Sequence, residues 1–124
     1  MIVADADVLI DWLNRRGGAP AVRSALERQE LATTAVGAYE LWAGAQTDEA
    51  RGDVRALLSL MTAILPFDDR AAVLAGTARR ELAAAGRTIG RADLLVAGIC
   101  LAADAPLLTR NRREFERVGG LRLA

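Results

Sequence analysis

The sequence predicts a single α/β domain in which a short central parallel β-sheet is flanked by helices on both faces. Short apolar segments alternate with longer segments whose apolar residues recur at helical spacing. The chain has 124 residues, the length of one ordinary domain. Hydrophobic residues make up 52% of it and aromatic residues only 4%, which favours tight helix packing over a β-sandwich.

The first part of the chain is expected to form two strands and three helices. The apolar run at residues 1–4 is typical of a buried strand, and the helical spacing that follows ends at two glycines, residues 17–18. A proline opens a second helix over residues 20–28. A short strand at residues 31–34 then leads into a helix at residues 36–45.

The middle of the chain is expected to hold three helices and one strand. Residues 48–62 and 70–85 carry apolar side chains at helical spacing, and a glycine ends the second of these helices. Between them, the apolar run at residues 63–67 contains a proline, which predicts a short or edge strand. Residues 92–103 are almost entirely apolar, so we expect a buried helix there.

The last segments continue the alternation. We expect a strand at residues 107–109, a short helix at residues 112–117 and a final strand at residues 121–123. Strands that alternate with helices in this way argue for a parallel sheet covered on both faces, in one domain over residues 1–124.

Composition limits the possible partners and compartments. The 16 basic and 16 acidic residues balance, and every basic residue is arginine, so a nucleic-acid contact must be local and must use bidentate guanidinium groups. Cys100 is the single cysteine and is expected to be a core residue. Acidic residues near the N-terminus and an apolar run of only residues 94–103 argue against a signal peptide or membrane span, so we expect a soluble, cytoplasmic protein.

Three acidic residues stand where burial makes them costly. Asp5 follows the first strand, where open parallel sheets bind ligands, although Asp5 or Asp7 could instead cap the next helix. Glu40 lies among apolar residues, either in a site or on a solvent-facing stripe. Asp93 begins the predicted buried helix, where a helix cap or a pair with Arg91 are the alternatives.

Taken together, these acids suggest a divalent metal site. Carboxylates about 4 Å apart repel by about 4 kcal/mol per pair, which a cation offsets. Oxygen ligands favour Mg²⁺ or Mn²⁺ over zinc, and such ions promote phosphodiester hydrolysis. The chain has no histidine, so the usual acid–base pair of metal-free RNA cleavage is missing. We therefore expect Asp5, Glu40 and Asp93 to converge, with no pair more than about 10 Å apart.

The whole chain resembles the PIN-domain ribonucleases. Four segments, at residues 1–10, 33–41, 86–97 and 107–115, resemble the four motifs of that family in order and spacing. Among its members the chain looks most like the VapC-type toxins of toxin–antitoxin systems. The resemblance implies a parallel sheet with acids at one edge, metal-dependent cleavage of single-stranded RNA, a homodimer and a cognate antitoxin that occludes the site. The apolar character of the helices within residues 48–85 also favours a homodimer.

The resemblance also implies roles for individual residues. Asp5, Glu40 and Asp93 take the positions of the metal-binding acids. The fourth position, often aspartate in the family, falls on Asn111, for which Glu114 could substitute. The resemblance and the flanking charges further suggest RNA phosphate or water contacts through Thr109, Arg110 and Arg112, with Arg87, Arg91 and Arg113 also nearby in sequence; each arginine could equally be a solvated or ion-paired surface residue.

Rival interpretations remain open at this point. Asp5 and Asp7 after a strand also resemble the first motif of haloacid-dehalogenase phosphatases, but that family and receiver domains usually use a lysine, and the chain has none. A PIN-like fold kept as a catalytically silent binding module is the other alternative, against which the three acids argue.

Overall fold

A four-stranded parallel sheet lies at the centre of the computed structural model, which describes residues 1–124. Its strand order is β3-β2-β1-β4. The strands are β1 (Ile2–Ala4), β2 (Leu31–Thr34), β3 (Ile64–Leu65) and β4 (Leu107–Leu108). The sequence therefore predicted the parallel α/β fold correctly, and β3, with its neighbouring proline, lies at an edge of the sheet as expected.

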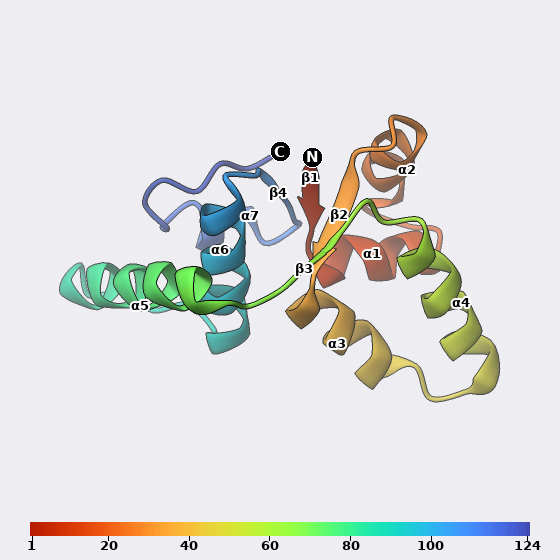
Figure 1. Ribbon diagram of the computed structural model, residues 1–124, viewed down its shortest axis with the longest axis horizontal. Coiled ribbons are helices and arrows are strands. Elements are labelled where there is room, and N and C mark those ends of the chain that lie inside the picture. Colours follow the sequence, from red (N-terminus) through yellow and green to blue (C-terminus); the bar gives the residue numbers. More distant parts are fainter.

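Seven helices cover the two faces of this sheet. Figure 1 shows α1, α2 and α4 on one side of the strands and α5, α6 and α7 on the other, while α3 extends from the lower end of the sheet. The helices are α1 (Ala6–Leu13), α2 (Ala19–Glu27), α3 (Ala35–Gly44), α4 (Asp48–Ser59), α5 (Asp69–Ala84), α6 (Arg91–Ala103) and α7 (Arg112–Phe115).

Side-chain caps fix where several helices begin. Thr34, Thr47 and Asp68 each accept a hydrogen bond from the backbone N–H three residues further on, which satisfies a free donor at the start of α3, α4 and α5. Because Thr34 is also the last residue of β2, strand and helix join with no connecting loop. This direct junction holds the start of α3 at the carboxyl edge of the sheet.

The expected last strand at residues 121–123 is the one predicted element that does not form. Leu123 makes only an isolated parallel bridge with Leu107. The reason is that β4 is two residues long, so it offers the returning chain too short an edge for a regular ladder. The first helix also ends at Leu13, before the two glycines that were expected to terminate it.

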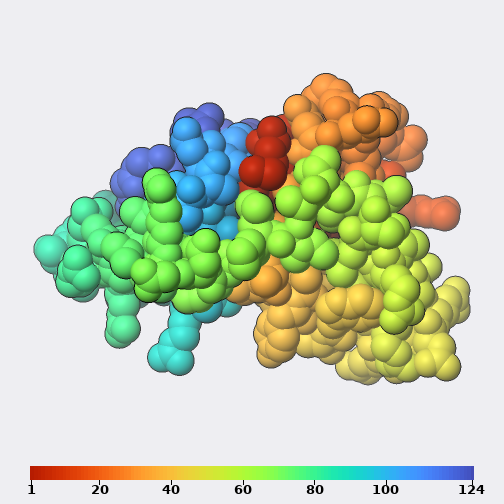
Figure 2. All heavy atoms as spheres, viewed as in Figure 1, coloured from red at the N-terminus to blue at the C-terminus, as the bar shows by residue number.

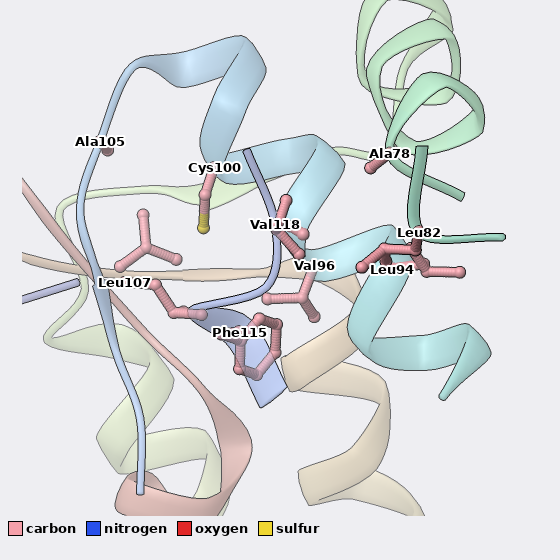
Figure 3. Close-up of a cluster of buried hydrophobic side chains, with 11 residues drawn as sticks. Ala78, Leu82, Leu94, Val96, Cys100, Ala105, Leu107, Phe115 and Val118 are labelled. Atoms are coloured by element: carbon pink, nitrogen blue, oxygen red, sulfur yellow. The ribbon is translucent and has the colours of Figure 1, made fainter. Parts of the chain in front are cut away.

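Two separate apolar cores lie on the two sides of the sheet. One contains Phe115, Val96 and Leu107, with Cys100 among them, and Figure 3 shows these side chains gathered between α6, α7 and β4. The other packs Leu9, Leu31 and residues of α2 to α4 against the opposite face. Cys100 is thus a core residue as predicted, and burial raises the pKa of its thiol to about 12. None of the helices is long and apolar enough to cross a membrane.

Helices α5 and α6 approach each other closely at Gly98. A Cβ atom added to Gly98 would lie 2.5 Å from the carbonyl oxygen of Ala71 and 2.7 Å from the Cβ atom of Ala75. Such distances leave no room for a side chain. Small residues on both helices therefore allow α6, which carries Asp93, to pack tightly against α5.

We expect Gly98→Ala to lower the free energy of unfolding by about 1–3 kcal/mol, because the added methyl group forces the two helices apart. Gly52→Ala is the matched control: it lies within α4 with nothing within 4 Å of the added Cβ atom. That change should raise stability by about 0.5–1 kcal/mol, through helix propensity alone. Urea unfolding measures both, and equal effects of the two substitutions would contradict the tight contact.

Candidate active site

The parallel register places three polar residues side by side at the carboxyl edge of the sheet. Ala4, the last residue of β1, lies opposite Thr33 of β2 and the last residue of β4. The next residues along the three strands are Asp5, Thr34 and Thr109, and all three are buried. Ligands of open parallel sheets bind at this edge, so the register itself defines a candidate site.

Asp5, Asp7 and Thr109 form a hydrogen-bonded group there. Thr109 Oγ1 lies 2.9 Å from Asp5 Oδ2 and 3.2 Å from Asp7 Oδ2, and it accepts the backbone N–H of Asn111 at 3.0 Å. Asp5 Oδ1 accepts the first N–H of α1, and Asp7 Oδ2 accepts the N–H of Arg110 at 3.0 Å. Because a hydroxyl carries one hydrogen, Thr109 donates to only one of the two carboxylates at a time.

Asp7 is a site residue that was not among the predicted catalytic acids. Its Oδ1 atom is buried and has no hydrogen-bond partner, which is rare for a buried carboxylate oxygen. Asp7 lies in the first turn of α1, two residues after Asp5, which caps that helix. The signal that could have identified it was the spacing itself, because two acids in the turn after a strand both lie at the carboxyl edge.

Asp93 reaches the site from the first turn of α6. The cap position of this helix is Gly90, which has no side-chain cap, and Asp93 makes no ion pair with Arg91, so neither alternative for Asp93 is observed. Instead, Asn111 Nδ2 lies 3.4 Å from Asp93 Oδ2. Glu114 of α7 is close enough to raise the pKa of Asp93, so both candidates for the fourth position lie beside this acid.

The acids share one electrostatic environment. Burial, then the charge of Asp7 and also that of Asp93, raise the pKa of Asp5 from 3.8 to about 6, although hydrogen bonds oppose the shift. Desolvation and the charges of Glu114 and Asp7 raise the pKa of Asp93. Desolvation and the charges of Asp93 and Asp7 raise the pKa of Glu40, which α3 presents at the exposed side of the site. The charge of Asp93 therefore contributes to the raised pKa of both other predicted acids, Asp5 and Glu40.

The three predicted acids nevertheless do not form a closed set of metal ligands. No group of three acidic or cysteine side chains lies close enough together to hold an ion directly. Helices α3 and α6 contact each other, and Figure 2 shows the outline of the molecule indented between α3 and the start of α6. Glu40 and Asp93 thus lie on neighbouring elements at an open edge.

The arginines suggested as RNA contacts differ in their surroundings. Arg110 Nε lies 3.0 Å from Oδ2 of the buried Asp11. Arg112 donates through Nη1 to the carbonyl oxygen of Ala124, at 2.7 Å. Three others are exposed and form no ion pair: Arg87, Arg91 and Arg113.

Comparisons with known proteins agree with this architecture. The model of the PIN domain family matches residues 2–121. The chain is 31% identical over 121 residues to the tRNA(fMet)-specific endonuclease VapC of Shigella flexneri, an alignment that covers 95% of this chain and 92% of that protein. It is 38% identical over 60 residues to the protein of the same name from Salmonella typhimurium, covering 48% of this chain and 46% of that one.

Solved structures show the same fold. The crystal structure of DNA-bound VapBC from Salmonella typhimurium superposes with a TM-score of 0.88 at 26% identity, over 99% of this chain and 96% of that one. VapBC2 from Rickettsia felis, bound to a promoter DNA fragment, gives a TM-score of 0.88 at 24% identity, over 100% of this chain and 98% of that one. With the match to the family model over nearly its whole length, the chain belongs to the PIN-domain family, among the VapC proteins.

Proposed function

We propose that this chain is the toxin of a toxin–antitoxin pair, an endoribonuclease that hydrolyses RNA phosphodiester bonds with Mg²⁺, for which Mn²⁺ can substitute. The observation that carries the proposal is the cluster of acids at the carboxyl edge of the sheet, in which Asp5 is buried and Asp7 and Asp93 are half-buried close to one another's charge. The 31% identical relative is named as an endonuclease specific for a tRNA, and for this chain we propose RNA as the substrate class.

The residues at this edge fit a hard divalent cation. Asp7 Oδ1 is a buried carboxylate oxygen without a partner, and burial together with neighbouring acids raises the pKa values of Asp5 and Asp93. A cation would satisfy that oxygen and relieve the repulsion. Magnesium commonly binds one or two carboxylates directly and keeps several waters, so it does not need three acids already at ligand distance. We propose that Asp5 and Asp7 hold it, with Asp93 and Glu40 acting through water.

Each side chain at the site has a separate role in this proposal. When bound, Mg²⁺ supplies positive charge that polarises the phosphate and lowers the pKa of water. Thr109 fixes the orientation of the carboxylates of Asp5 and Asp7 through its shared hydroxyl. Asn111 orients the carboxylate of Asp93, and its amide oxygen would be a neutral ligand at the fourth position when the cation is bound. Glu40, with its raised pKa at the exposed edge, is placed to exchange a proton with water.

We also propose the assembly and location expected for such a toxin. Similar structures are described as toxin–antitoxin complexes, for example one from Klebsiella pneumoniae, which supports a cognate antitoxin as partner. A homodimer is supported by large exposed apolar side chains, among them Tyr39, Phe67 and Val73. The cytoplasm, where RNA is available, is the proposed location. A silent binding module is disfavoured because the chain keeps Asp5, Glu40 and Asp93.

We expect Asp5→Asn and Asp93→Asn each to lower the rate of RNA cleavage about a hundredfold, on the order of 3 kcal/mol in transition-state stabilisation, because each removes one charge that holds the cation. Asn111→Ala should lower the cleavage rate less than either aspartate change, since a neutral ligand contributes less to holding the cation. The assay is cleavage of a labelled RNA with Mg²⁺ or with EDTA, on proteins shown to be folded by circular dichroism. Glu49→Gln, an exposed change at the start of α4, is the control. Undiminished cleavage in EDTA, or an active Asp93→Asn protein, would refute the metal mechanism.

The metal-free protein should become more stable as the pH falls from about 7 to about 4. The pKa of Asp5 rises from 3.8 to about 6 on folding, so the ionised carboxylate destabilises the native state above pH 6, and the penalty disappears below pH 4. The ionised carboxylate of Asp5 lowers the free energy of unfolding by at most about 3 kcal/mol. Asp5→Asn removes it, so the stability difference between the variant and the wild type should be largest near pH 7 in EDTA and close to zero at pH 4. Saturating Mg²⁺ should reduce the difference at pH 7. A difference that does not depend on pH would contradict this account.

Light scattering at micromolar concentration should give the mass of two chains, because the exposed apolar side chains are covered in a dimer. Dilution should then move the mass towards one chain. A single-chain mass at every concentration would count against the homodimer and would leave the cleavage prediction untouched.

A further inference from the structure

A second charged group lies one helical turn along α1 from the acid cluster. Asp11 is fully buried and accepts the backbone N–H of Gly18 at 2.8 Å. Two arginines approach the same carboxylate through their Nε atoms: Arg16 at 3.4 Å and Arg110 at 3.0 Å. A Cβ atom on Gly17, whose φ is +49°, would lie 2.4 Å from Asp11 Oδ2, so the loop is closed tightly around this acid.

The group carries a net positive charge that faces outwards. One buried negative charge, Asp11, lies beneath two positive charges whose side chains are 63% exposed in Arg16 and 55% exposed in Arg110. Neither arginine uses its terminal Nη atoms in any hydrogen bond or ion pair. Arg16 donates to the carboxylate through Nε, and Arg110 Nε lies 3.0 Å from it in an ion pair, so the Nη groups of both arginines remain available as a fork suited to two oxygens of a phosphate.

Arg110 is fixed relative to the acid cluster at two points. Its backbone N–H donates to Asp7 Oδ2, and its side chain is held by Asp11. Asp11 lies four residues after Asp7 on α1, which places the two residues about 6 Å apart along the helix axis on the same face. The guanidinium group of Arg110 is therefore held close to the acid cluster, within reach of an anionic strand that binds there.

We propose that Arg110 binds the backbone phosphate of the RNA strand next to the one that is cleaved, and that Asp11 is the positioning residue that holds Arg110 there. The proposal rests on the ribonuclease function proposed above and identifies where the substrate strand runs. The chain has no net charge, so a fixed local cation is what anchors the strand.

The test is the cleavage of a labelled single-stranded RNA oligonucleotide in Mg²⁺ over a series of salt concentrations. Arg110→Gln should raise KM about tenfold with kcat within about twofold, and should lower the slope of log KM against log salt by about 0.7, the value for one lost single-strand phosphate contact. Arg110→Lys should keep the slope, because the charge remains, while KM rises because the fork is lost.

The KM and salt slope of an Asp11→Asn protein test the role of Asp11. Asp11→Asn should raise KM and lower the salt slope as Arg110→Gln does, and the double variant should be no worse than Arg110→Gln alone, because both changes remove the same contact. An Asp11→Asn protein that loses thermal stability but keeps the wild-type KM and slope would overturn its positioning role. If this variant does not fold, the two Arg110 variants decide the phosphate contact.

Arg28→Gln is the matched control. Arg28 is also an exposed arginine held through Nε by a carboxylate, that of Glu30 at 2.6 Å, but it lies just before β2, at the opposite edge of the sheet. The Arg28→Gln protein should cleave RNA with the same KM and salt slope as the wild type. An Arg110→Gln protein with unchanged KM and slope would overturn the phosphate contact while the ribonuclease function stands. A wild-type protein that neither binds nor cleaves RNA would instead overturn the function itself, and this inference with it.

Discussion

The hydroxyl group of Thr109 is the contact on which the site depends, because it joins the two ends of the chain. It lies within hydrogen-bond distance of Asp5 and Asp7, which precede it by 104 and 102 residues. The contact requires β4 to pair with β1 in one register, since a shift by one residue would turn Thr109 to the other face of the sheet. The core around Phe115, just after this segment, holds that register in place.

The acids at this edge work against the stability of the fold. Asp5 is buried beside other negative charges, and one oxygen of Asp7 is buried without a partner. A chain selected for stability alone would not keep such groups, because neutral or apolar side chains cost less to bury. The two cores on either side of the sheet offset this cost. Groups that cost stability in this way are typical of a functional site.

Along one face, helix α1 contacts two groups of opposite net charge. Its first turn presents Asp7 to the acid cluster, and the next turn presents Asp11 to two arginines. The net charge of the chain is zero, so long-range attraction to a polyanion is weak and short-range placement matters more. Under the proposed function, Asp7 on this helix helps to bind the cation, and Asp11 one turn further on positions Arg110, which lies outside the helix, for a phosphate.

The sequence by itself determined the alternation of strands and helices, the parallel sheet and the edge at which the acids gather, because apolar periodicity and chain direction are local properties. It also identified Asp5, Glu40 and Asp93 as candidates, which stay predictions as metal ligands. Only the tertiary structure showed that Asp7 has a buried oxygen without a partner, that Asn111 faces Asp93, and that the last segment forms a single bridge. These features arise where segments distant in sequence meet, and no local pattern specifies the distances or the solvent exclusion between them.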